Sequence, residues 1–150
     1  MADTVDLTGD IAETINGAAL RGHSLVLGYV DEQGEAAISF RGSTQVHTPT
    51  QLAIWARKAE DGLAKAIDTH PRVTLLYYCA DGAPGPKYLY VKGIAHVDPS
   101  ANDAVYDAMI EGERKQDPDR NGVAVVIDVD TVNGFGTEGA FSMQRTAGAS

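Results

Sequence analysis

Cysteine is almost absent from this sequence, because Cys79 is the only one among 150 residues. A lone cysteine can form neither an intrachain disulfide nor a cysteine-rich metal site, so a disulfide-stabilised secreted domain and a zinc ribbon are both excluded. The histidines lack the close pairing of a metal motif: they are His23, His47, His70 and His96. We therefore expect no metal, and the cysteine usage favours a cytoplasmic location.

Positive charge is also scarce, since 12 Lys and Arg stand against 21 Asp and Glu, for a net charge of −9. Broad nucleic-acid binding needs clustered Lys and Arg, and so does docking on anionic membranes, so the charge argues against both kinds of partner. No apolar run approaches the roughly 20 residues that cross a bilayer. The first ten residues, "MADTVDLTGD", are acidic and lack the basic and apolar regions of a signal peptide.

The length and the hydrophobic content of 43% favour a single domain over residues 1–150, with a core over about 10–136 and a short flexible C-terminal tail. Strand-like and helix-like patterns predict six strands and three helices. The strands follow in hairpin-like succession, which favours an α+β fold with an antiparallel sheet or small barrel and helices outside. The predicted strands are 23–30, 36–41, 51–56, 71–79, 87–97 and 123–136, and the helices are 10–20, 57–67 and 100–112.

The sequence also predicts a bulge and an edge position in the last two strands. Gly93 interrupts a β-prone run and is a candidate β-bulge. In the final strand, Asp128 and Asp130 alternate with apolar residues, which predicts the solvated face of an edge strand. Side chains fill the interior of a six-stranded barrel, so a ligand would need an external groove or a subunit interface.

One stretch of the chain contains no acid at all. From residue 36 to residue 59 there is neither Asp nor Glu, although 21 of 150 residues are acidic and about three would fall there by proportion. The window carries Arg41, Arg57 and Lys58 among several Ser and Thr hydroxyls, which suit a bound phosphate. The predicted helix from residue 57 would add N–H groups and the positive end of its dipole. An ordinary basic surface stripe has the same composition.

Trp55 is the only tryptophan and lies two residues before Arg57. Its indole would suit one wall of a site for a flat aromatic ligand, whereas a lone Trp also serves in a core or an interface. A nucleotide-binding glycine loop is absent, because "GFGTEG" (134–139) leads into no helix, and no nucleophile elbow surrounds Ser39. The sequence assigns no catalytic residue. Four strand tyrosines could donate protons, and their spacing selects none: Tyr77, Tyr78, Tyr88 and Tyr90.

The order of these segments resembles a known family. The hairpin "LVLGYVDEQGEAAISFRGS", the segment "QLAIWARKAEDGLAKAI", then "HPRVTLLYY" and "KYLYVKGIAHV" follow one another as in the pyridoxamine 5′-phosphate oxidase-like family. The resemblance covers about residues 10–135, with His70 in place of the usual Asn. It implies a homodimer of six-stranded antiparallel split β-barrels, the FMN-binding split barrel, with flanking helices.

The resemblance also implies a cofactor and its binding residues. FMN, or in some branches a deazaflavin or haem, lies in a groove between the subunits of such proteins. Arg, Lys, Ser or Thr from the second strand and from the turn after the third hold the phosphate. Carried over by position, the phosphate residues are Ser39, Arg41, Ser43, Arg57 and Lys58, while Ile54 and Trp55 would lie along the ring system.

The sequence departs from the oxidases at "EDGL" (60–63), where they carry a basic pair, and the ending "FSMQRTAGAS" lacks their substrate-binding Arg and His. A vitamin-producing oxidase is therefore not expected. The leading hypothesis is a flavin- or deazaflavin-dependent oxidoreductase that acts on a small-molecule substrate. The alternatives are a non-catalytic flavin or haem carrier and a cofactor-free dimeric interaction module. FMN and deazaflavins both carry a phosphate and a flat tricyclic ring, so the sequence leaves both open.

Overall fold

The computed structural model describes residues 3–81 and 84–146. Within these ranges strands predominate and the helices are short. The strands are β1 (Asp3–Thr4), β2 (Leu25–Val30), β3 (Ala36–Arg41), β4 (Gln45–Thr48), β5 (Gln51–Ala56), β6 (Arg72–Tyr78), β7 (Tyr88–Val97), β8 (Val123–Gly136) and β9 (Gly139–Gln144). The helices are α1 (Asp10–Gly17), α2 (Leu63–Thr69), the 3-10 turn η1 (Pro99–Ala101), α3 (Asn102–Ala108) and α4 (Glu111–Arg114).

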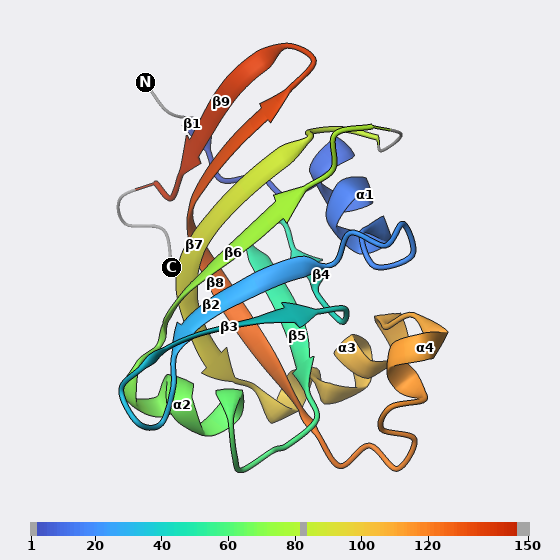
Figure 1. Ribbon diagram of the computed structural model, residues 1–150, viewed down its shortest axis with the longest axis vertical. Coiled ribbons are helices and arrows are strands. Elements are labelled where there is room, and N and C mark those ends of the chain that lie inside the picture. The colour runs from blue at the N-terminus through green and yellow to red at the C-terminus, as the bar shows by residue number, and fades with distance from the viewer. Residues whose placement is uncertain (1–2, 82–83, 147–150) are drawn as a thin grey trace.

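The strands of the described chain form one nine-stranded sheet that curves into a barrel (Figure 1). The order is β1-β9-β8-β7-β6-β2-β3, and β8 also pairs with β5, which pairs with β4. Within residues 3–81 and 84–146, β3 pairs with β2 alone and β4 with β5 alone. The ring of strands is therefore split between β3 and β4, although only residues 42–44 separate these strands in the chain.

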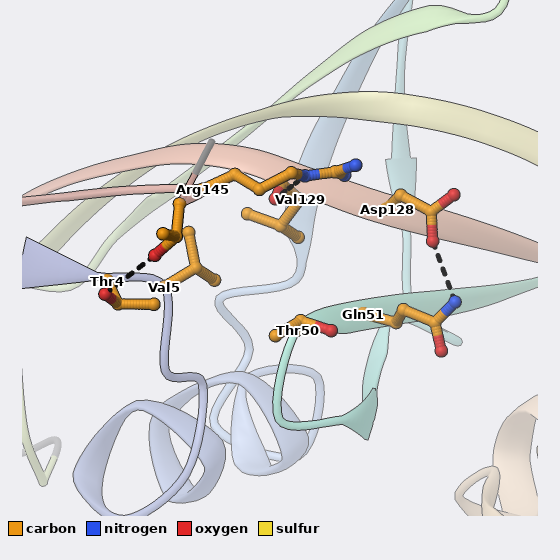
Figure 2. A pocket seen from close by; sticks show the side chains of 8 residues that line it. Thr4, Val5, Thr50, Gln51, Asp128, Val129 and Arg145 are labelled. Atoms are coloured by element: carbon orange, nitrogen blue, oxygen red, sulfur yellow. Dashed lines mark hydrogen bonds between the residues drawn. The ribbon is translucent and has the colours of Figure 1, made fainter. Parts of the chain in front are cut away.

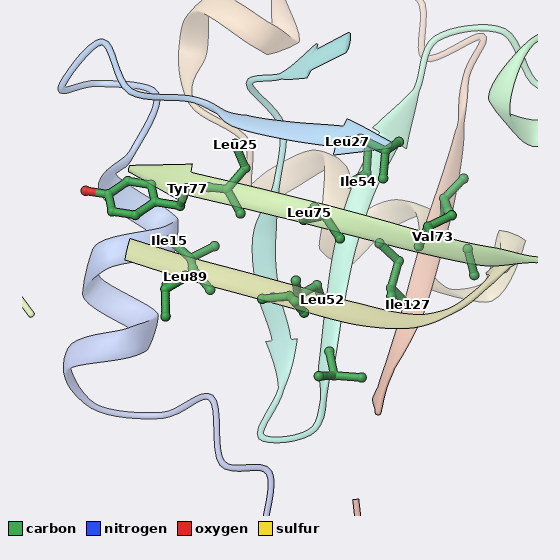
Figure 3. Close-up of a cluster of buried hydrophobic side chains, with 14 of the residues drawn as sticks. Ile15, Leu25, Leu27, Leu52, Ile54, Val73, Leu75, Tyr77, Leu89 and Ile127 are labelled. Atoms are coloured by element: carbon green, nitrogen blue, oxygen red, sulfur yellow. The ribbon is translucent and has the colours of Figure 1, made fainter. Parts of the chain in front are cut away.

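Apolar side chains fill the inside of the barrel (Figure 3). On β6, Val73, Leu75 and Tyr77 are buried, while the residues between them face outward, as the two-residue period of a strand requires. Ile54 of β5 and Ile127 of β8 contribute to the same core and are fully buried. The interior is thus occupied by side chains, as the sequence predicts for a barrel of this size.

A second apolar cluster lies on the outer side of β5 and β8. Successive residues of a strand point to opposite faces, so β5 directs Ile54 into the barrel and Trp55 toward α3. Figure 1 shows α2 near one end of the barrel and α1 near the other, with α3 beside β5 and α4 beyond α3. The cluster consists of Ala53, Trp55, Ala101, Val105, Tyr106, Met109, Ala124 and Val126.

All six predicted strands are present, and the α+β fold is confirmed. Three further strands were not predicted, since β4 lies in an expected loop and β1 and β9 lie outside the expected core of 10–136. The predicted helix 57–67 is wrong at its start, because α2 begins at Leu63 after the turn at Gly62, whose φ is 57°. The predicted helix 100–112 is divided into η1, α3 and α4. Parts of two other expectations, the loop at 82–83 and the tail at 147–150, lie outside the described residues.

The prediction of an edge strand at Asp128 and Asp130 is wrong. β8 pairs with β7 on one side and with β5 and β9 on the other, so it is an interior strand. Its partners explain the two acids, since Asp128 accepts a hydrogen bond from Gln51 at 2.8 Å and Asp130 pairs with Arg145 at 3.2 Å. The bulge expected at Gly93 is confirmed, because the β7–β8 register shifts between Lys92 and Gly93.

Gly93→Ala should lower the free energy of unfolding by about 1–3 kcal/mol, because a β-carbon there would overlap the backbone oxygen of Asp128. The matched control is Gly112→Ala in α4, where an added β-carbon meets no atom within 4 Å. That variant should keep or slightly raise the stability. Urea denaturation of the three proteins measures both effects. Equal stability of the Gly93 variant and the unchanged protein would contradict the close strand contact at the bulge.

Candidate functional site

A basic pocket of about 470 Å³ lies beside the split in the barrel. Its lining comes from the ends of β2, β3 and β5, from the turn before α2, and from the segment after α4. It brings together three cations that are separated by up to 17 positions in the sequence: Arg41, Arg57 and Lys58. The other lining residues are Tyr29, Ala56, Asp61, Gly62, Leu63 and Gln116.

Arg41 is held in the pocket by two neighbours. Its Nε donates a hydrogen bond to Ser39 Oγ at 3.0 Å, and its guanidinium carbon lies 5.9 Å from the centre of the Tyr29 ring. Among residues 3–81 and 84–146, no carboxylate lies within ion-pair distance of Arg41. The terminal guanidinium nitrogens therefore remain available to an anion from outside the chain.

Arg57 and Lys58 line the same pocket from the turn that follows β5. Both side chains are exposed, and Arg57 Nη1 donates to Gln116 Oε1 at 3.2 Å. Asp61 also lines the pocket, so its charge offsets part of the three positive charges. The prediction that a helix dipole contributes to the site is wrong. The helix α2 starts at Leu63, and Arg57 and Lys58 precede it by more than one turn.

The other expected cofactor residues have structural contacts in the chain. Ser43 Oγ accepts the backbone N–H of Trp55 at 2.9 Å and ties the start of β4 to β5. The Trp55 ring, 4% exposed, meets Tyr106 edge-on at 5.3 Å in the cluster under α3. Ile54 is fully buried inside the barrel. None of these three side chains lines the basic pocket, so their contact with a cofactor stays a prediction.

Asp117 is a residue that the sequence did not single out, and it anchors the wall of the pocket. Its Oδ2 accepts the indole N–H of Trp55 at 2.9 Å and the backbone N–H of Gly122 at 2.8 Å, and its Oδ1 accepts the N–H of Asn121 at 2.9 Å. Burial by itself would raise the pKa of Asp117, but these hydrogen bonds and the nearby Arg57 charge outweigh it and lower the pKa below 3.8. The sequence could not indicate this role, because Asp117 and its bonded partner Trp55 lie 62 positions apart in the chain.

The four candidate proton donors lie away from the basic pocket. Tyr77 is inside the barrel, where burial raises the pKa of its phenol against the opposing effect of a hydrogen bond from Arg21 at 2.9 Å. The side chains of Tyr78, Tyr88 and Tyr90 alternate with buried residues and face outward. Tyr29, which the sequence analysis did not name, is the tyrosine that lines the pocket.

A second pocket, of about 220 Å³, lies where β1, β5, β8 and β9 meet (Figure 2). Its polar groups are engaged with one another: Gln51 donates to Asp128 at 2.8 Å, and the threonine hydroxyls Thr4 and Thr146 are 3.0 Å apart. Arg145, at the same pocket, pairs with Asp130. These internal contacts satisfy the groups that would otherwise recognise a ligand, so the basic pocket is the stronger candidate site.

Within residues 3–81 and 84–146, no group of three or more His, Cys, Asp or Glu side chains is arranged to hold a metal ion. No helix in these ranges combines the length and the apolar character that crossing a membrane requires.

Solved structures share this architecture. A pyridoxamine 5′-phosphate oxidase-related, FMN-binding protein from Nostoc punctiforme matches with a TM-score of 0.63 at 17% identity, over 91% of this chain and 87% of its own. A protein of the pyridoxine-phosphate oxidase family from Clostridium acetobutylicum, related to general stress protein 26, gives a TM-score of 0.59 at 11% identity, over 91% and 96% of the two chains. An F420 reductase gives 0.55 at 18% identity, over 73% and 88%.

No family model and no curated protein matches the sequence. The structural likeness nevertheless defines the class: the chain has the split-barrel fold of the FMN-binding, pyridoxamine 5′-phosphate oxidase-like structures. The resemblance expected from the sequence is thus confirmed at the level of the fold.

Asp117→Asn should lower the free energy of unfolding at neutral pH by about 1.5–3 kcal/mol, since it weakens hydrogen bonds made to a charged acceptor. The folded-state pKa of Asp117 lies below 3.8, so its stabilisation is complete above that value and is lost as the pH falls through the folded pKa. The difference between the variant and the unchanged protein should therefore shrink in acid. Urea denaturation over a pH series measures it.

Asp119→Asn is the matched control, because Asp119 is exposed in the same loop. It should leave both the stability and its pH dependence within about 0.5 kcal/mol of the unchanged protein. A stability difference for Asp117→Asn that stays constant down to strongly acid pH would show that the charge of Asp117 does not hold the loop.

Proposed function

We propose that the basic pocket binds the phosphate of a flavin-type cofactor, with FMN as the first candidate. The observation that carries this proposal is the convergence of Arg41, Arg57 and Lys58, with no protein carboxylate within ion-pair distance of Arg41 among the described residues. Guanidinium groups bind phosphate through paired, charge-assisted hydrogen bonds. The pocket is also outside the filled barrel, where a ligand of this size has to lie.

The fold supports the same class of ligand. One similar structure is an FMN-binding protein and another is an F420 reductase, so a deazaflavin is the second candidate. Haem is less well supported, because no His, Cys or Met lines the pocket to ligate an iron. A bound flavin would supply hydride or electron transfer. The chain would then hold the phosphate with Arg41 and Arg57 and orient Arg41 through Ser39 and Tyr29.

The protein would accordingly be a flavin-dependent oxidoreductase with a small-molecule substrate. A non-catalytic flavin carrier is the alternative, and it has one observation in its favour: the pocket is lined by no His, the side chain that acts most often as a general acid or base, and by no Glu. Reduction of the bound flavin by a reduced nicotinamide at a rate that supports turnover would favour the enzyme. The single buried cysteine favours a reducing compartment such as the cytoplasm.

Arg41→Ala and Arg57→Ala should each weaken FMN binding by about 1.5–3 kcal/mol, the scale of one charge-assisted contact. The purified protein should show the visible absorption of a flavin, and titration of the apoprotein with FMN measures the affinity. Arg72→Ala is the control, since Arg72 is exposed on β6 outside the pocket, and it should bind FMN as the unchanged protein does. Full FMN affinity in both pocket variants would reject the site.

We also propose that the protein is a homodimer, paired through the outer face of the β3-β2-β6-β7 sheet. Phe40 lies opposite Val26, which lies opposite Leu76, so apolar side chains cross three strands in one row. The large exposed side chains on this face are Ile38, Phe40, Leu76 and Tyr78, and Phe135 of the neighbouring β8 is exposed as well. A contiguous apolar patch on a soluble domain marks an interaction surface, and β3 adds the open edge of the sheet.

A second copy on this face would border the basic pocket, because Phe40 and Arg41 are neighbours on β3 and point to opposite sides of it. The partner would then lie against β3 at the rim of the pocket, on the face opposite Arg41. This arrangement agrees with a cofactor groove at a subunit interface, which the family resemblance implies.

Phe40→Asp should convert the dimer to a monomer, because it would bury an unpaired carboxylate in the interface. Phe40 is 76% exposed in the single chain, so the fold should survive, as circular dichroism would verify. Leu20→Asp is the matched control, since Leu20 is equally exposed but lies in the turns after α1, outside the sheet. Sedimentation velocity reports the mass of each protein. An unchanged protein that sediments as a monomer, or a Phe40 variant that stays dimeric, would contradict the proposal.

A further inference from the structure

The basic pocket adjoins a second depression, which carries an acid as well as a cation. This depression, of about 350 Å³, is lined by Arg57, Ile110, Gly112, Glu113 and Gln116. Arg57 and Gln116, which are joined by a hydrogen bond of 3.2 Å, line both hollows, so the two hollows are adjacent and are together called the groove. Beyond this pair the groove offers the Glu113 carboxylate, which is an acceptor of hydrogen bonds only.

Glu113 is placed beside the strand that carries Arg41. Its carboxylate lies against Gly42, so closely that a β-carbon on Gly42 would overlap Glu113 Oε1. Gly42 follows Arg41 directly, at the turn between β3 and β4. Glu113 is half-buried, and within residues 3–81 and 84–146 its side chain forms no ion pair with a Lys, Arg or His.

A carboxylate at this point affects two kinds of ligand in opposite ways. It repels a bare phosphate held by Arg41 and Arg57, because both are negative. It attracts a hydroxyl on the same ligand, because a hydroxyl donates to an ionised carboxylate in a strong hydrogen bond. An ammonium group would gain less, since Arg57 borders the same depression and would repel it. The groove therefore suits a phosphate that is joined to a neutral, hydroxyl-bearing chain.

We propose that Glu113 accepts a hydrogen bond from a hydroxyl of the ligand and so selects phosphorylated polyols over simple phosphates. This inference rests on the proposed function, because Arg41, Arg57 and Lys58 hold the phosphate in both. It goes further in assigning a specificity residue and a ligand class, the phosphate monoester of a polyol. The ribityl phosphate of FMN belongs to that class.

The test compares two probes, ribitol 5-phosphate and inorganic phosphate, by isothermal titration of the apoprotein. Glu113→Gln should reduce the ratio of the two affinities about 5- to 10-fold, since the polyol loses a charge-assisted acceptor. Inorganic phosphate should bind as well as before or more tightly, because a repelling charge has gone. Gly42→Ala should reduce the same ratio by displacing the carboxylate without removing it.

Glu111→Gln is the matched control, because Glu111 lies in the same helix, pairs with Lys115 at 3.2 Å and does not line the groove. It should leave the ratio unchanged. Binding of both probes with the same ratio in the Glu113 variant would overturn the role of Glu113 and leave the phosphate pocket standing. An unchanged protein that binds neither probe would overturn both proposals.

Discussion

Side chains from β2, β5, β6, β7 and β8 pack against one another inside the barrel and fill it. This packing confines a ligand to the outer surface, because protein interiors are packed about as densely as organic crystals. The candidate site on that surface lies at the split, where β3 and β4 lack a partner on one side within the described residues. Arg41 lies at the end of β3 and Arg57 follows β5, so both cations stand at that opening. The position of the candidate site is thus a consequence of how the core is filled.

Trp55 connects this opening to the rest of the molecule. Its backbone N–H is held by Ser43 after β3, and its indole N–H by Asp117 in the loop before β8. The residues next to these contacts line the groove: Arg57 follows two positions after Trp55, and Gln116 precedes Asp117. Buried hydrogen bonds to a charged carboxylate are costly to break, so the two walls of the groove are fixed relative to each other. A tryptophan that does not line the pocket can in this way determine its shape.

The basic residues of the site were predictable because their signal is local. An acid-free window from residue 36 to residue 59 suggested an anion pocket, with a basic surface stripe as the alternative, and the structure brings Arg41, Arg57 and Lys58 of that window into one pocket. The helix expected at residue 57 failed because Gly62, in a left-handed conformation, delays the start of α2. Glu113 and Gln116 were not predicted, since they reach the groove from a segment more than 50 positions away.

By itself the sequence determined the six main strands and the split-barrel class, because strand periodicity and the order of segments are properties of the chain read locally. It also determined the acid-free window from residue 36 to residue 59 that carries Arg41, Arg57 and Lys58. Only the tertiary structure decided which of those cations converge, that Ile54 and Trp55 pack on opposite faces of β5, and that β8 is an interior strand. These outcomes depend on contacts between residues far apart in the chain, which neither propensity nor local pattern encodes.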